Sequence, residues 1–212
     1  MFGRRPTTEP QGPAVPPVTD ADLVRHALQD PQAFATVFDR YHRDIYLYCL
    51  RRLGNPEEAD DAAGTVFLKA YAALDRFRPG RDGAGMTFRS WIFAIAHNVV
   101  VDTWRKPTRT VSLDTERGTE IANRIPAPGC SPEHLAIRSE EARTVLTLLA
   151  TLPEQHRAVV ELRLAGLSVK EVAAALGISV AAAKSNQYRG YQRLRDLMEA
   201  RPEQAPAEEL VG

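Results

Sequence analysis

The stretch GLSVKEVAAALGISVAAAKS, residues 166–185, holds two consecutive helix starts. Ser168 and Glu171 have the spacing of a capping box, in which each side chain accepts a hydrogen bond from the backbone N–H of the other residue. Gly177 suits the left-handed conformation that ends a helix, and Ser179 can cap the helix that follows. Two helices joined by a turn of about three or four residues that contains glycine are typical of a DNA-binding helix-turn-helix.

A further helix is expected directly upstream of this stretch. The residues TLPE begin with Thr151 as a candidate N-cap, place a proline just inside the helix and put Glu154 three positions after the cap. The apolar pattern then runs to about Leu164, and Gly166 is a suitable helix end. Together the three helices predict a small helical unit that binds DNA.

The last helix of this unit, which runs to about residue 198, has two different faces when its residues are placed about 100° apart. Val180, Ala183, Tyr191, Leu194 and Met198 fall on the face expected to pack inward. The opposite face and its edges carry the forked and cationic side chains that base edges and phosphates require. A solvated basic face on an ordinary bundle helix is the simpler alternative. The predicted DNA-contacting residues are Ser179, Lys184, Ser185, Asn186, Tyr188, Arg189, Gln192 and Arg193.

A second helical segment with an acidic outer side is expected after Asn55. Asn55 can cap it, Pro56 suits its first position and Glu58 its third. The acids on its outer side could dock a basic partner, but they also suit the positive end of the helix dipole, and both explanations stay open. The predicted docking residues are Asp60, Asp61, Thr65 and Leu68.

Residues 88–106, FRSWIFAIAHNVVVDTWRK, are apolar almost all round the predicted helix. Such a helix is buried or serves two partners at once. Basic residues before it and at its end favour a nucleic-acid strand as one partner, and interleaved aromatic rings suit unstacked bases. Phe88, near the helix entry, is the better candidate to meet a base, whereas Trp91 is better suited to the core. The candidate strand-contacting residues are Phe88, Arg89, Trp91, Asn98, Arg105 and Lys106.

Proline and glycine punctuation divides the chain, and the predicted fold is all-α, with two small helical domains joined by a flexible linker. The net charge of zero is a sum of separated patches, since basic residues gather in 76–106 and 150–198 and acidic residues in 55–75. The expected parts are a Pro-rich disordered extension (1–19), a first domain (20–106), the linker (107–132), the helix-turn-helix domain (133–198) and an acidic tail (199–212).

Several classes of protein are disfavoured by the composition. No apolar run approaches the roughly 18 residues that a membrane span needs, and the basic start lacks the apolar stretch of an export signal, so we expect a cytoplasmic protein without membrane contact. Five histidines without metal-ligand spacing and two cysteines, Cys49 and Cys130, predict no metal site, although a reactive thiol at Cys130 stays possible. Without a glycine-rich phosphate loop either, we expect no catalysis and no cofactor.

Three segments together resemble one known family. Residues 59–71, ADDAAGTVFLKAY, resemble the region-2 helix of extracytoplasmic-function sigma factors of the sigma-70 family. Residues 88–102 resemble the promoter-melting segment that follows it. Residues 152–157, LPEQHR, and 166–185 resemble the region-4 helix-turn-helix. The ordered set, with a tether between the halves, carries the resemblance.

The resemblance implies a division of labour between these segments. The helix with Asp60 and Asp61 would dock on the clamp helices of the largest subunit of core RNA polymerase. The 88–106 segment would recognise and open the -10 element of promoter DNA, with Asn98 and Arg105 facing the DNA. The last domain would read the -35 element and touch the flap of the second-largest subunit. An anti-sigma protein would hold such a factor inactive until a stress signal arrives.

The sequence departs from the family pattern at Gly64-Thr65, where Gln-Glu is common, and at residues 181–183 and Asn186 of the last helix. Promoter preference therefore cannot be carried over from the family. Two alternatives remain at this level. A stand-alone helix-turn-helix regulator would bind duplex DNA without polymerase, usually as a dimer. A helical adaptor protein would explain the acidic helix but would leave Arg189 and Arg193 without a role.

Overall fold

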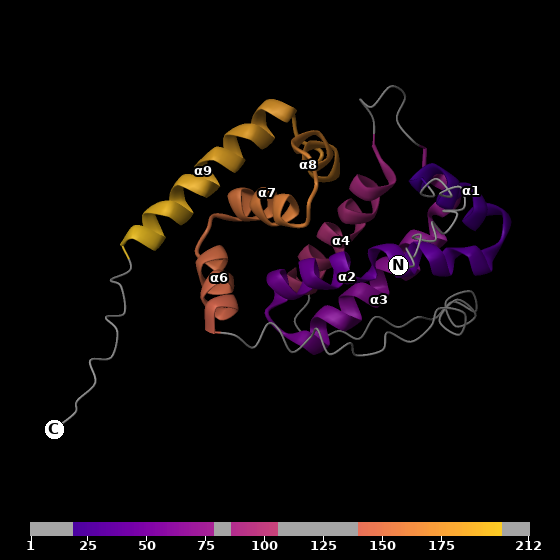
Figure 1. Ribbon diagram of the computed structural model, residues 1–212, viewed down its shortest axis with the longest axis horizontal. Helices are drawn as coiled ribbons and strands as arrows, with labels where there is room; N and C mark the ends of the chain where they lie inside the picture. Colours follow the sequence, from indigo (N-terminus) through magenta and orange to yellow (C-terminus); the bar gives the residue numbers. More distant parts are fainter. Residues whose placement is uncertain (1–18, 79–85, 106–139, 201–212) are drawn as a thin grey trace, which may run out of the picture.

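The computed structural model describes residues 19–78, 86–105 and 140–200, and within these ranges the chain forms helices and no strands. The all-α prediction is therefore confirmed. The predicted linker, residues 1–18 of the extension and residues 201–212 of the tail lie outside the described residues. The N-terminal half contains α1 (Asp20–Gln29), α2 (Phe34–Leu53), α3 (Pro56–Ala72) and α4 (Phe88–Arg105), with short 3-10 turns at Pro31–Ala33 and Leu74–Arg76. The C-terminal half, orange to yellow in Figure 1, contains α6 (Glu140–Ala150), α7 (Glu154–Leu164), α8 (Val169–Leu176) and α9 (Val180–Glu199).

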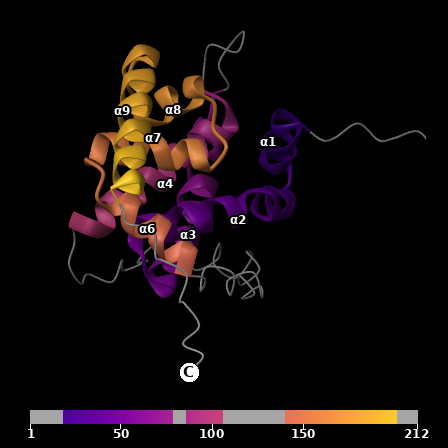
Figure 2. The same ribbon diagram turned by 60° about the vertical axis from the view of Figure 1, so that its left-hand side comes forward.

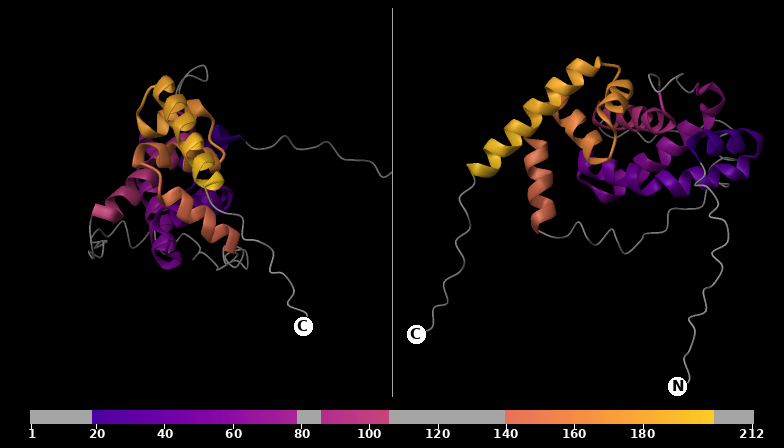
Figure 3. Two further views of the ribbon diagram at one scale, coloured as in Figure 1. Left: turned by 90° about the vertical axis from the view of Figure 1, so that its left-hand side faces the viewer. Right: turned by 45° about the horizontal axis from the view of Figure 1, so that its top comes forward.

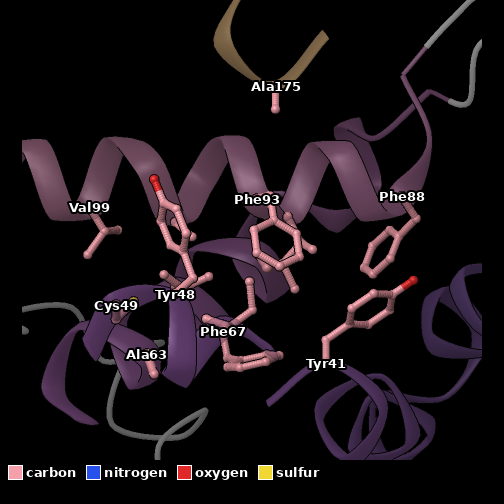
Figure 4. Close-up of a cluster of buried hydrophobic side chains, with 14 of the residues drawn as sticks. Tyr41, Tyr48, Cys49, Ala63, Phe67, Phe88, Phe93, Val99 and Ala175 are labelled. Atoms are coloured by element: carbon pink, nitrogen blue, oxygen red, sulfur yellow. The ribbon is translucent and has the colours of Figure 1, made fainter. Parts of the chain in front are cut away.

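An aromatic core holds α2, α3 and α4 together. Tyr48 of α2 and Phe67 of α3 are fully buried, and Phe93 of α4 meets Tyr48 edge-on with ring centroids 5.8 Å apart. Figure 4 shows Tyr48, Phe67 and Phe93 reaching into the space between these helices. The apolar stripe predicted for α3 is confirmed, because its members Ala59, Ala63, Val66, Ala70 and the following Leu74 are all buried.

Most helix ends lie where the sequence predicts them. The side chain of Asn55 accepts hydrogen bonds from the first turn of α3. Ser168 and Glu171 form both bonds of the capping box at the start of α8, and the hydroxyl of Ser179 caps α9. Gly177 ends α8 with a φ of 64°, in the left-handed region that favours glycine. The predicted boundaries of the helix-turn-helix are therefore confirmed.

The predicted cap of α7 is wrong. Thr151 does not cap this helix, since its hydroxyl donates instead to the carbonyl oxygen of Leu148 at 2.7 Å. α7 begins only at Glu154, with Pro153 in the cap position and no side-chain cap bond. The physical reason is that α6 ends directly before this turn, and the last carbonyl groups of a helix lack partners within the helix. The Thr151 hydroxyl satisfies one of those carbonyls.

Gly190 allows α9 to lie unusually close to α7. A Cβ atom at this position would lie 2.6 Å from Cγ2 of Val160, which is well inside van der Waals contact. Glycine is therefore required here by packing rather than by backbone conformation. Ala183, two turns earlier on α9, is fully buried, and Leu194 packs on a small cluster formed by Leu149, Leu152 and Val160.

The two halves of the chain pack directly on one another, which the sequence analysis did not predict. α8 contacts α4, and α7 meets α2. Leu162, Leu167 and Val172 of the C-terminal half are buried in the same apolar cluster as Phe93 and Ala96 of α4. Figures 2 and 3 show α7, α8 and α9 gathered on one side of the N-terminal helices, with α1 on the far side.

Candidate nucleic-acid interface

The face of α9 that was predicted to contact DNA is open to solvent. Tyr188 is 67% exposed, and its hydroxyl accepts a hydrogen bond from the Gln192 amide at 3.0 Å. Within the described ranges, none of the basic residues on this face forms an ion pair. The side chains of this face are therefore available to phosphates and base edges. The predicted residues Ser179, Lys184, Ser185, Arg189 and Arg193 are exposed, and Asn186 and Gln192 are half-buried.

The inward face of α9 is smaller than predicted. Ala183 is buried and Leu194 is partly buried, but Val180, Tyr191 and Met198 are 39%, 42% and 63% exposed. α9 has 20 residues and packs on α7, which has 11, so the C-terminal turns of α9 extend beyond their support, as Figure 1 shows. The prediction that these three side chains pack inward is wrong. The overhang accounts for Met198, whereas Val180 lies in the first turn of α9, at the other end of the helix.

The residues predicted on α4 fall into two groups. Asn98 and Arg105 are exposed, as a DNA-contacting role requires, and Lys106 lies outside the described residues. Trp91 is half-buried against Phe77, with ring centroids 5.2 Å apart. Phe88 is only 2% exposed.

Phe88 belongs to the core rather than to the surface. Its ring packs on Tyr41, Phe77 and Trp91 at centroid separations of 5.5, 5.5 and 5.4 Å. Figure 4 shows Phe88 pointing down from α4 toward Tyr41. The expectation that Phe88 meets a base is not met in this arrangement, because the first turn of α4 is directed into the aromatic core.

The predicted docking residues form the outer side of α3. Asp61 is exposed, and Asp60, Thr65 and Leu68 are half-buried. One carboxylate oxygen of Asp60, Oδ1, is buried without a hydrogen-bond partner in the described residues. Gly64 lies on the same helix, and a Cβ added there would meet nothing within 4 Å. Its presence is therefore not required by packing.

Arg89 of α4 is engaged with the C-terminal half. One of its terminal nitrogens donates to the carbonyl oxygen of Ala165 at 2.5 Å and lies 3.0 Å from Oδ2 of Asp44. Nearby, the Thr87 hydroxyl donates to Oε1 of Glu171 at 2.9 Å. These contacts join the start of α4 to the turn between α7 and α8 and to the first turn of α8.

A second polar contact lies at the other end of α4. Arg52, whose side chain is fully buried, pairs with Glu154 and lies with its Nε 3.3 Å from Oε2 of Glu161, an ion pair without hydrogen-bond geometry. Arg157 donates to Oε1 of Glu161 at 2.8 Å. The sequence analysis missed this cluster. A charge within the apolar run AVVELRL, at Glu161, is the signal that could have indicated it.

Burial shifts the pKa of several ionisable groups in this second contact. It raises the pKa of the Glu161 carboxyl, although Arg52 and Arg157 oppose the rise. It lowers the pKa of the Arg51 guanidinium. Burial, and then the nearby Arg52, also lower the pKa of His97, so its ring is neutral at neutral pH; its Nδ1 lies 3.2 Å from the Tyr48 hydroxyl. These shifts indicate that charges have been removed from water here.

The described residues offer no site for a metal. No group of three or more histidine, cysteine or acidic side chains lies close enough to hold an ion in those ranges. Cys49 is buried, which raises the pKa of its thiol to about 12, and Cys130 lies outside the described residues. No described helix is both long and apolar enough to cross a membrane.

Family models match both halves of the chain. The model for sigma-70 region 2 matches residues 37–110, which include α3 and α4. The model for sigma-70 region 4 matches residues 142–194, which include the helix-turn-helix. The two matches follow one another in the order that the resemblance predicted.

Curated relatives and solved structures agree with these matches. The chain is 35% identical to the ECF RNA polymerase sigma factor SigW of Bacillus subtilis over 171 residues, which cover 78% of this chain and 89% of SigW. It is 33% identical to the ECF sigma factor ShbA of Streptomyces griseus, over 84% of this chain and 94% of ShbA. CnrH, solved with the cytosolic domain of CnrY, superposes with a TM-score of 0.63 at 27% identity, covering 85% and 97% of the two chains. RpoE of Bartonella quintana, with a TM-score of 0.56 at 20% identity, shares the fold.

Proposed function

The chain belongs to the extracytoplasmic-function sigma factors of the sigma-70 family, and from this premise we propose how its surfaces divide the work of transcription initiation. As a sigma factor it directs promoter-specific initiation by core RNA polymerase. The stand-alone regulator is not favoured, because region 2 and region 4 are both matched in one chain and in order. The observation that carries the proposal is the open, basic face of α9 on a complete helix-turn-helix.

We propose that this face of α9 reads the -35 element. Arg189 and Arg193 offer forks for guanine or phosphate, and the Gln192 amide suits adenine. Lys184 can neutralise a phosphate, and Ser179 at the helix start places backbone N–H groups near the DNA backbone. Ser185, Asn186 and Tyr188 complete the reading surface. The flap of the second-largest polymerase subunit would contact the same half.

We propose that α4 contacts the -10 element. Asn98 and Arg105 supply exposed polar contacts, and Arg89, Trp91 and Lys106 are assigned to the same function. Phe88 is left out, since its ring is buried in the aromatic core. Region 2 then extends over residues 20–106, region 4 over 133–198, and the linker over 107–132.

Core polymerase would dock on the outer side of α3. Asp61 is an exposed acid on this side, and Asp60, Thr65 and Leu68 flank it. A basic surface on the polymerase clamp would complement these carboxylates. We further propose a cytoplasmic, non-catalytic protein without cofactor. A protein inhibitor of the anti-sigma class is proposed as well, since the similar CnrH has been solved with part of a second protein.

Run-off transcription with purified core polymerase tests the proposed function. Specific transcripts that form only when this protein is added would support it, and the shared upstream sequence would identify the -10 and -35 elements. Asp61→Arg should abolish co-purification with core polymerase, because it reverses the charge of the docking surface. Arg25→Glu on α1, far from that surface, is the matched control and should bind normally. Wild-type yield of the Asp61→Arg complex would contradict the docking assignment.

A further inference from the structure

We propose that the free chain is autoinhibited by its own C-terminal half: a releasable latch between α2/α4 and α7/α8 holds the helix-turn-helix against the helix assigned to the -10 element. The latch consists of Arg52, Arg89, Trp104, Arg157 and Glu161 with the groups that they contact. The inhibitory part of this inference rests on the proposed function, because it takes Arg89 to be a DNA-contacting residue.

An apolar strip forms the middle of the latch. Leu167 and Val172, at the turn before α8 and on α8 itself, are fully buried in one cluster with Phe93 and Ala96 of α4. Figure 4 shows Ala175 directed toward α4 above Phe93. Without α4 these side chains of the C-terminal half would face water, so closure buries apolar surface and is favourable.

The first polar cluster of the latch lies where α2 ends. Arg157 reaches from α7 to the carbonyl oxygens of Arg51 and Arg52, at 2.8 and 3.3 Å, while its Nε donates to Glu161. The last carbonyl groups of a helix are unpaired within it and carry the negative end of the helix dipole. A guanidinium from the other half therefore complements them, and Glu161 links it to Arg52.

Trp104 covers this cluster at the end of α4. The guanidinium carbon of Arg52 lies 4.4 Å from its ring centroid and that of Arg157 lies 5.8 Å away. One indole thus contacts an arginine from each half of the molecule. Cation–π contacts of this kind gain strength when the cation is shielded from water.

The second polar cluster occupies a residue of the proposed DNA surface. The Arg89 side chain is shared between Asp44 and the Ala165 carbonyl, and Thr87 beside it bonds to Glu171. Arg89 cannot make these bonds and contact a phosphate or base with the same nitrogen. Closure therefore withdraws this nitrogen of Arg89 from the -10 element and weakens engagement of the element by α4.

The composition of the contact makes it releasable. Arg52 pairs with Glu154 and Glu161, and Arg157 pairs with Glu161. Nε and Nη2 of the neighbouring Arg51 are buried without hydrogen-bond partners in the described residues. Charges taken from water lose much of what their pairing gains, and opening returns them to solvent. The ion pairs therefore add little to the stability of the closed form, and a partner that binds only the open form can shift the balance.

Single-molecule fluorescence transfer in the full-length chain tests the latch by itself. Labels at Glu57→Cys and Glu199→Cys, both exposed positions, report the separation of the halves in a Cys130→Ser background. The free protein should give a dominant, narrow high-transfer population. Arg52→Glu places a third carboxylate beside Glu154 and Glu161 and should shift it to a broad, low-transfer distribution. Arg25→Glu, which reverses an arginine outside the latch, should leave it unchanged.

A second variant, in the C-terminal half, distinguishes release of the latch from misfolding of the chain. Glu161→Gln keeps the side-chain shape but removes the charge between two arginines, and it should also open the chain while the circular dichroism stays helical. An unchanged transfer distribution in both variants, with helix content retained, would overturn the latch.

The inhibitory role has its own readout. Without polymerase, Arg52→Glu should bind a single-stranded oligonucleotide carrying the -10 sequence identified by run-off transcription about tenfold more tightly than the wild type, if the closed form outnumbers the open form by about ten to one. Equal affinity in a variant shown to be open would overturn inhibition while leaving the latch itself in place. Failure of both proteins to bind that oligonucleotide would instead count against the proposed assignment of α4 to the -10 element, since the transfer measurement requires no partner.

Discussion

The two halves of the molecule fill their cores with different side chains. The N-terminal half buries aromatic rings from α2, α3 and α4, among them Phe34, Tyr48, Phe67 and Phe93. The described part of the C-terminal half has only two aromatic residues, both tyrosines of α9, and both are exposed. Its own small cluster of leucine and valine lies under α9, and other buried apolar side chains of this half share a cluster with α4. The first half thus builds most of its core from its own helices, whereas the second completes its core by contact with the first.

The largest test of this comparison is Phe67→Ala. The ring is fully buried in the aromatic core, so its removal should lower the free energy of unfolding by about 3–5 kcal/mol. Urea unfolding followed by circular dichroism measures the loss. Tyr188→Ala, an exposed aromatic of the other half, is the matched control and should change stability by no more than about 0.5 kcal/mol. Equal losses in the two variants would show that burial in the aromatic core does not set the contribution of the Phe67 ring.

Gly190→Ala tests how tightly the smaller core is packed. The added methyl group would overlap Val160, so stability should fall by about 1–3 kcal/mol and α9 should move away from α7. Thermal unfolding measures the first effect, and affinity for duplex DNA with the -35 element measures the second. A stable variant with unchanged DNA affinity would show that small shifts of α7 and α9 accommodate the added methyl group.

Arg189→Ala tests whether the open face of α9 is the reading surface. We expect a loss of about 1–3 kcal/mol in binding free energy on the cognate -35 sequence, with relaxed preference at one position. Quantitative footprinting with the holoenzyme measures both. Stability should be unchanged because Arg189 is exposed and forms no ion pair within the described ranges. An unchanged footprint would remove this residue from the interface.

Gly64→Ala should have the smallest effect, and in the opposite direction. A Cβ at this position of α3 meets nothing within 4 Å, so alanine should raise stability by up to about 1 kcal/mol through its higher helix propensity. Thermal unfolding beside Gly190→Ala gives a direct contrast between two helical glycines. A destabilised Gly64→Ala would mean that the glycine serves a backbone geometry that its surroundings do not reveal.

Local features of the fold could be predicted from the sequence because they depend on residues three or four positions apart. The Ser168–Glu171 capping box, the Gly177 turn and the Asn55 cap are of this kind. Thr151 was misassigned because two helix ends compete for one hydroxyl, and the pattern does not show which of them the hydroxyl bonds. The exposure of Met198 depends on the length of α7, which another segment sets.

Contacts between the halves could not be predicted in the same way. Arg52 and Glu154 are 102 residues apart, and a charge in an apolar run shows only that some partner is needed. The sequence therefore predicted separate parts of the candidate site, namely the exposed face of α9 and the exposed residues Asn98 and Arg105. What was missing is that Arg89 is already engaged by the other half and that Phe88 is turned into the core.

The close approach of α9 to α7 also restricts how this protein can change over generations. Val160 and Gly190 share one small volume, so a larger residue at position 190 is tolerable only after position 160 has become smaller. Substitutions at the two positions are accepted in one order and rejected in the other. The tilt of α9 is thus set by residues 160 and 190 together. A descendant with a different tilt must first accept a smaller residue at position 160, which leaves a small void beside Gly190.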